Sequence, residues 1–127
     1  MKRILLCLMV ALFATGCLFA KNNDEKMNVM SYNIRYDNSG DKDNQWKFRR
    51  DFAADLVKFH EADVFGAQEV LNNQLNDLLD RLPEYAYVGV GREDGKTKGE
   101  YAPIFYRKDR FSVEKSGNFW LAEDINA

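Results

Sequence analysis

The chain has 127 residues, of which 46% are hydrophobic, and its 18 lysines and arginines against 20 aspartates and glutamates give a net charge of −2. This length allows one small domain at most, and the near-average composition excludes a collagen, a coiled coil, a disordered tail and a disulfide scaffold. The slightly acidic balance argues against a protein that coats nucleic acid, because such a protein presents a basic surface.

The first 20 residues have the order of a secretory signal. Two basic residues precede an unbroken apolar run at 4–14, and small residues follow this run. Because a bilayer span needs roughly 20 apolar residues, we expect export rather than membrane insertion. This divides the chain into a signal at 1–20, a polar tether at 21–26 and a domain at 27–127.

Two cleavage sites are compatible with this signal. Ala14-Thr15-Gly16-Cys17 resembles a bacterial lipobox, in which the cysteine is lipidated and becomes the first mature residue, although alanine stands where leucine is usual. The alternative is ordinary cleavage after Ala20. Lipidation of Cys17 predicts an envelope protein anchored to a membrane without a transmembrane helix, and ordinary cleavage predicts a periplasmic or secreted protein.

The first half of the domain alternates between strand and helix patterns. Apolar residues on both faces of the segment from Met27 to Arg35 predict a strand that is buried on two sides. Residues 36–45 are rich in Asp, Asn, Ser and Gly and predict a loop. A helix follows, and we assign its apolar face to residues spaced by three or four, namely Phe48, Phe52, Leu56 and Phe59, with Ala53 and Val57 beside them.

The second half continues with shorter elements. Residues 64–67 predict a strand, and regularly spaced leucines between Leu71 and Leu82 predict a helix that Pro83 ends. The order β-α-β-α-β-β-β indicates an α/β layered fold. The last three strands are expected at 85–90, 101–107 and 111–121, the last two joined by a tight turn at 108–110, with Pro103 at a bulge or an edge.

Two polar side chains follow predicted strands directly. Asn33 lies at the end of the first strand and Glu69 just beyond the second. In parallel α/β sheets the carboxyl ends of adjacent strands line the ligand crevice, and a carboxamide beside a carboxylate suits Mg²⁺, which takes oxygen ligands. From the residues alone, the alternative is that Glu69 caps the N-terminus of the following helix.

A family resemblance rests on longer segments. Ser31-Tyr32-Asn33-Ile34-Arg35 and Asp63-Val64-Phe65-Gly66-Ala67-Gln68-Glu69 resemble the opening of the endonuclease/exonuclease/phosphatase superfamily, and the similarity continues through Trp46, Arg49 and most of the following chain. It implies the N-terminal half of a four-layer α/β/β/α sandwich, namely one mixed sheet with two helices in an incomplete domain. We interpret Trp46 as a loop-to-helix anchor and Arg49 as a partner for nearby acids.

The resemblance also implies a site. Its members hydrolyse phosphoesters with metal-activated water, so Mg²⁺ or Mn²⁺ is the expected cofactor. Asn33, Glu69 and Glu100 match catalytic positions: Glu69 and Asn33 lie at the metal, and Glu100 matches an acid that holds a catalytic histidine. Arg92 is either a phosphate contact or a solvated loop charge. Superfamily substrates include nucleic acids, phospholipids and inositol or sugar phosphates, so the substrate class stays open.

The downstream motifs of the superfamily do not follow in this sequence. A mid-domain histidine, a Gly-Asp-x-Asn segment and a closing Ser-Asp-His are absent from it, and the one histidine, His60, is interpreted as a helix-end residue. We therefore expect an N-terminal fragment of an exported phosphoesterase, with negligible activity alone and a bare inner sheet face. The alternative is a non-catalytic envelope lipoprotein that uses the half-domain for binding or assembly. The sequence defines no protein partner.

Overall fold

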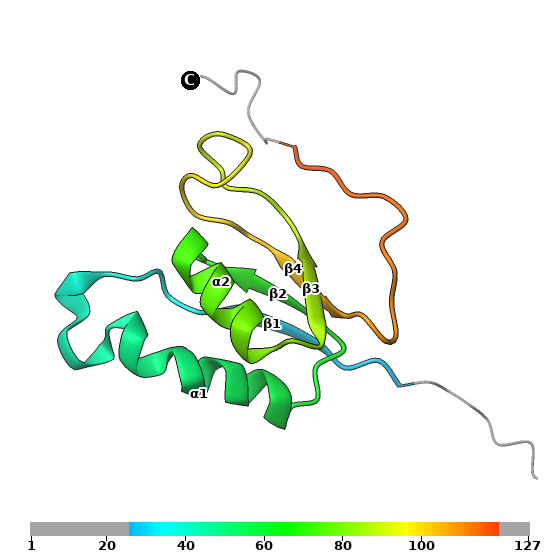
Figure 1. Ribbon diagram of the computed structural model, residues 1–127, viewed down its shortest axis with the longest axis horizontal. Coiled ribbons are helices and arrows are strands. Elements are labelled where there is room, and N and C mark those ends of the chain that lie inside the picture. The colour runs from blue at the N-terminus through cyan, green and yellow to red at the C-terminus, as the bar shows by residue number, and fades with distance from the viewer. Residues whose placement is uncertain (1–25, 120–127) are drawn as a thin grey trace, which may run out of the picture.

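The computed structural model describes residues 26–119, which form one mixed sheet covered on one face by two helices (Figure 1). The sheet has the strand order β1-β2-β4-β3, in which β1 and β2 are parallel and the other two pairs are antiparallel. The predicted α/β class, with one mixed sheet and two helices, is confirmed. The elements are β1 (Val29–Asn33), the 3-10 helix η1 (Ser39–Asn44), α1 (Trp46–Phe59), β2 (Val64–Gln68), α2 (Asn72–Arg81), β3 (Tyr85–Val88) and β4 (Ile104–Arg107).

The core lies between the helices and the alternating inward side chains of the strands. The strand register sets Met30, Phe65, Phe105 and Tyr87 side by side in one row across all four strands. Phe65 and Phe105 are fully buried, and their rings stack with centroids 4.5 Å apart. Because the row also meets buried leucines of α2, the sheet and the helix share one hydrophobic cluster.

The helix α1 packs through only part of the predicted apolar face, the part that contains Ala53 and Val57. Its buried residues are Trp46, Ala53, Ala54 and Val57. The predicted contact residues Phe48, Phe52 and Phe59 are 62%, 68% and 80% exposed. Both stripes are apolar, so spacing alone does not separate them, and the stripe with the alanines lets the helix approach its neighbours more closely.

The carboxylate of Asp77 on α2 joins the two helices. The Trp46 indole Nε1 donates to one oxygen of Asp77 at 2.8 Å. The other oxygen pairs with Arg50 of α1 at 3.3 Å and with Arg81 of α2 at 3.2 Å. Trp46 is therefore the anchor that the sequence predicted, and α2 supplies its partner.

Three expectations, one about a loop and two about strands, need correction. Residues 36–45 are not a loop throughout, because η1 forms within them. The strand β1 lies at a sheet edge with Val29 64% exposed, so within residues 26–119 it is not buried on two sides. No strand forms at 111–119, because β4 already lies between β2 and β3 and leaves no edge for a hairpin partner. The end of that expected strand, like the signal segment with Cys17, lies outside the described residues.

The second face of the sheet is the more open one within the described part of the chain. Ile104 on this face is 49% exposed, while its neighbour Phe105 points to the helices and is fully buried. Pro103 directly precedes β4, where its carbonyl accepts from the Ala67 N–H at 2.9 Å and its missing N–H costs no ladder bond. No helix among residues 26–119 is long and apolar enough to cross a membrane.

Asp63 joins the starts of β1 and β2 to the end of β4. Its side chain is buried, accepts the Asn28 N–H at 2.8 Å and forms an ion pair with Arg110. Its carbonyl accepts the N–H of Arg107 at 3.0 Å. The bond from Asn28, followed by the pairing with Arg110, lowers the pKa of the Asp63 carboxyl below its ordinary value of 3.8 against the opposing effect of burial.

The packing of α1 can be tested with two substitutions on different faces of the helix. Val57→Ala should lower the free energy of unfolding by about 2 kcal/mol, because it removes two buried methyl groups and leaves a cavity. Phe52→Ala should change it by no more than about 0.5 kcal/mol, since its ring is mostly in solvent and alanine favours the helix. Urea unfolding of the full chain measures both values, and a larger loss for Phe52→Ala would refute this orientation of α1.

The contribution of Asp63 should depend on pH. Its folded-state pKa lies below the unfolded value, so the ionised carboxylate stabilises the fold above about pH 4 and this contribution is lost as the pH falls through the folded-state pKa. Asp63→Asn should therefore unfold more easily than the wild type at pH 7, with a difference that shrinks in acid. Asp43→Asn, at an exposed carboxylate, is the control. A pH-independent difference for Asp63→Asn would argue against the ion pair.

Candidate active site at the strand ends

The parallel pairing of β1 and β2 brings the two predicted ligands together. The register places Asn33 opposite Gln68, so Glu69 follows at the same edge of the sheet. The Asn33 Nδ2 donates to Glu69 Oε1 at 2.8 Å, although 36 residues separate the two in the chain. A carboxamide and a carboxylate therefore meet at the carboxyl ends of adjacent parallel strands, where ligands bind in α/β sheets.

The second oxygen of Glu69 faces the loop that follows β1. Glu69 Oε2 accepts the Tyr36 N–H at 3.2 Å and lies 3.9 Å from the guanidinium of Arg35. The hydrogen bond from Asn33, followed by that from Tyr36 and the nearby Arg35 charge, holds the pKa of the Glu69 carboxyl below its ordinary value. Glu69 is thus ionised at neutral pH and available to a cation.

Glu69 does not cap α2 in this arrangement. Its carboxylate bonds to β1 and the loop after it, and the N–H of Leu71, the residue before α2, is taken by the Gln74 Oε1 at 3.1 Å. The alternative in which Glu69 serves only the helix end is therefore not what the structure contains.

Two residues of the site have left-handed backbones. The φ angles are 59° at Glu69 and 60° at Arg35, a region that side chains other than glycine adopt at a cost of about 1 kcal/mol or more. Such strain persists only where the surroundings hold it, and it is concentrated at functional sites. Lys42 and Glu61, outside the site, have left-handed backbones as well, so the site is identified by the side chains that meet there and not by the backbone alone.

Gln74 of α2 and Arg49 of α1 hold the loop after β1. Gln74 is fully buried, donates to the Arg35 carbonyl at 2.8 Å and accepts the Asp37 N–H at 3.0 Å. Arg49 donates to the carbonyls of Ile34 at 2.7 Å and Arg35 at 3.4 Å. Arg49 was expected to pair with acids, but its hydrogen bonds go to the carbonyls of Ile34, Arg35 and Asn44.

A cleft of about 410 Å³ lies beside the hydrogen-bonded pair Asn33 and Glu69. Three of the predicted site residues line it, namely Glu69, Arg92 and Glu100. The Arg92 guanidinium lies 3.4 Å from the Glu100 carboxylate, and its side chain is 65% exposed. Arg92 is therefore an ion-paired residue at the cleft rather than an isolated loop charge. Asn33 does not line this cleft and is connected to it by its hydrogen bond to Glu69.

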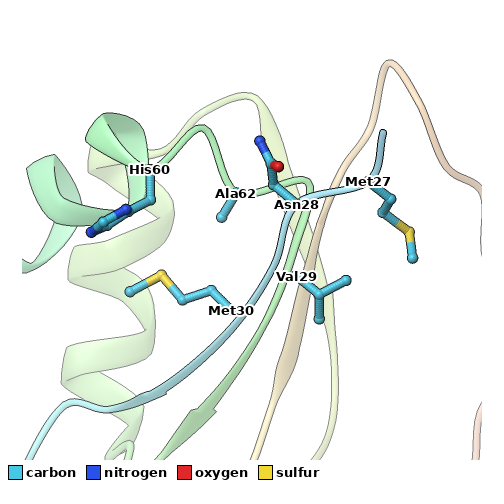
Figure 2. Close-up of a pocket in the computed structure, with 6 residues that line it drawn as sticks. All are labelled: Met27, Asn28, Val29, Met30, His60 and Ala62. Atoms are coloured by element: carbon cyan, nitrogen blue, oxygen red, sulfur yellow. The ribbon is translucent and has the colours of Figure 1, made fainter. Parts of the chain in front are cut away.

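His60 lies at the opposite end of β1, where it lines a pocket with the residues before and at the start of this strand (Figure 2). It follows the last residue of α1, and its ring meets Phe59 edge-on at 5.2 Å. Since the cleft lies at the carboxyl end of β1, His60 does not contact Glu100. The interpretation of His60 as a helix-end residue agrees with this position.

The donor set of the site fits a hydrated hard cation. Among residues 26–119 no three His, Cys, Asp or Glu side chains gather in a way that could hold a metal ion. Glu69 offers one ionised carboxylate, and Asn33 turns its Oδ1 to the Arg35 N–H at 2.9 Å. Mg²⁺ is bound through one or two carboxylates, waters and substrate phosphates, so this set suits it, with Asn33 orienting Glu69 in the observed geometry. The ligand and catalytic roles of these residues stay predictions.

The sequence analysis did not single out Arg35 and Gln74 as site residues. Arg35 was visible as the last residue of the segment that carries the resemblance, directly after Ile34. Gln74 gave no signal, since a glutamine in a polar stretch of helix is usually solvated, and only its burial reveals its role.

The comparisons with known proteins agree with this geometry. An endonuclease/exonuclease/phosphatase from Bacteroides vulgatus is 55% identical and covers 76% of this chain and 37% of its own, with a TM-score of 0.73. A mannosyl-6-phosphatase from Bacteroides thetaiotaomicron is 45% identical and covers 77% of this chain and 38% of its own, with a TM-score of 0.75. An uncharacterized protein of Acanthamoeba polyphaga mimivirus is 26% identical over an alignment 124 residues long, which covers 84% of this chain and 18% of that protein. No family model matches the sequence.

These similarities confirm the resemblance that the sequence predicted. Over about three quarters of its length, the chain is similar in sequence and in its phosphoesterase-like fold to part of endonuclease/exonuclease/phosphatase family proteins. The chain spans less than two fifths of the two solved structures, at 37% and 38% of their lengths.

The hydrogen bond from Asn33 should be measurable in the titration of Glu69. Asn33→Ala should raise the pKa of the Glu69 carboxyl toward its ordinary value, because the largest stabilisation of the ionised form is lost. Carbon-13 NMR of the glutamate carboxyl in the full chain follows this titration. Asn73→Ala, which removes a bond to Asp37 at 2.9 Å in the same loop, should leave the pKa unchanged. An equal shift in both variants would mean that the loop, and not the Asn33 amide, sets the pKa.

Proposed function

We propose that this chain carries part of the active site of an exported, Mg²⁺-dependent phosphoesterase of the endonuclease/exonuclease/phosphatase family. The observation that carries the proposal is the 2.8 Å hydrogen bond between Asn33 and Glu69 at the ends of two parallel strands, with Glu69 held in a left-handed backbone. Mn²⁺, which prefers similar oxygen ligands, is the other candidate ion.

In this proposal Glu69 holds the cation and Asn33 orients the carboxylate. The chemistry that bound Mg²⁺ supplies is polarisation of a phosphoryl oxygen and a lower pKa of bound water. Glu100 and Arg92 line the adjoining cleft as an ion pair at 3.4 Å, and in this proposal the cleft receives the phosphoester. Glu100 can orient a proton-transfer group, and Arg92 can contact the phosphate or the group attached to it.

A sugar phosphate is the substrate class that we propose to test first. The support is the similarity to the mannosyl-6-phosphatase from Bacteroides thetaiotaomicron, at 45% identity over 77% of this chain. Nucleic acids, phospholipids and inositol phosphates are the other substrate classes that remain candidates. Export would use the signal at 1–20, with a lipid anchor at Cys17 or cleavage after Ala20.

Binding of Mn²⁺ to the full chain tests the proposal without requiring turnover. Electron paramagnetic resonance of free Mn²⁺ should show saturable binding, and Glu69→Gln should weaken it about tenfold or more, because the one carboxylate at the strand ends loses its charge. Glu84→Gln, the same change at an exposed glutamate, is the matched control. The absence of saturable binding, or equal losses in the two variants, would refute the proposal.

A further inference from the structure

The Arg35 side chain lies between two carboxylates at the edge of the cation site. Its Nε and Nη2 each donate to one oxygen of Asp41 at 3.1 Å, so the planar group is held bidentately. The guanidinium also lies over the ring of Tyr36, with its carbon 4.3 Å from the ring centroid. These contacts fix the plane of the guanidinium before any ligand binds.

The third nitrogen of this guanidinium, Nη1, donates no hydrogen bond within residues 26–119. Nη1 lies 3.9 Å from Glu69 Oε2, which is close enough for charge attraction but too far for a hydrogen bond. Within residues 26–119 the side-chain hydrogen bonds of Arg35 go to Asp41 through Nε and Nη2. With a side chain that is 48% exposed, Arg35 thus presents the Nη1 donors to solvent beside Glu69.

The backbone of Arg35 is fixed by contacts with its surroundings. Arg35 has a φ of 60°, its N–H donates to Asn33 at 2.9 Å, and its carbonyl accepts from buried Gln74 at 2.8 Å. A surface ion pair alone contributes about 0–1 kcal/mol and gives no reason for a left-handed arginine tied to both helices. The result of this arrangement is that the Arg35 guanidinium is held beside the Glu69 carboxylate.

We propose that Arg35 Nη1 contacts a non-bridging oxygen of the phosphate bound at Glu69, and that Asp41 is the residue that positions Arg35. This inference rests on the proposed function and narrows its substrate class to phosphate monoesters. A monoester dianion has three non-bridging oxygens against two in a diester, so one oxygen stays free after the cation and Arg35 have each taken one. The dianion also gains more from this added positive charge than a monoanionic diester does.

The test measures the affinity of Mn²⁺-loaded full chain for inorganic phosphate at pH 8 by calorimetry, with dimethyl phosphate as the diester probe. Arg35→Gln should weaken phosphate binding about tenfold, because a charge-assisted hydrogen bond is lost. Its effect on dimethyl phosphate should be smaller, and Mn²⁺ should bind as well or better, since a cation beside Glu69 is removed. Arg107→Gln, which breaks an exposed pair with Asp109 at the far end of the sheet, is the matched control and should change nothing.

Two more variants separate positioning from simple charge. Asp41→Asn leaves Arg35 charged but frees it, so phosphate affinity should fall if Asp41 positions the guanidinium; a rise would overturn this role. Arg35→Lys keeps the charge without the bidentate contact and should show an intermediate loss, which also covers the case that Arg35→Gln does not fold. If Mn²⁺ binds and neither Arg35 variant weakens phosphate binding, the inference fails while the proposed function stands. If Mn²⁺ does not bind the wild type, the proposed function fails first.

Discussion

The parallel pairing of β1 with β2 is the constraint on which the rest of the structure depends. Its register sets Asn33 opposite Gln68 and carries Glu69 to the same edge. The same pairing starts at Asp63, whose buried carboxylate takes the Asn28 N–H. A shift of one residue would turn every side chain of β1 to the other face of the sheet and separate the amide of Asn33 from the carboxylate of Glu69.

The sequence predicted the elements that repeat a strong local pattern. The strands β1 to β4 and both helices lie where apolar periodicity and Pro83 place them, because these signals act over a few residues. The face of α1 was not predictable in this way. Both stripes of α1 are apolar, but only the one with Ala53 and Val57 contacts the rest of the domain. Those tertiary contacts decide which stripe is buried. The expected strand at 111–121 failed within 111–119 for a topological reason, since β4 has a partner on each side.

The candidate site likewise contains residues that the sequence predicted and residues that it did not. Asn33 and Glu69 are predictable because each follows its strand directly, and strand ends meet in a parallel sheet. Gln74 and Asp41 are not, because their importance comes from contacts with the loop after β1 that no local pattern records. Gln74 links α2 to this loop by two hydrogen bonds, of 2.8 and 3.0 Å, so the site is supported by a helix that contributes no ligand.

The left-handed backbones of Arg35 and Glu69 carry a consequence for how this protein can change. At both positions glycine would relax the chain, yet it would remove the guanidinium from one and the carboxylate from the other. Selection for stability and selection for chemistry therefore favour different residues at these two positions.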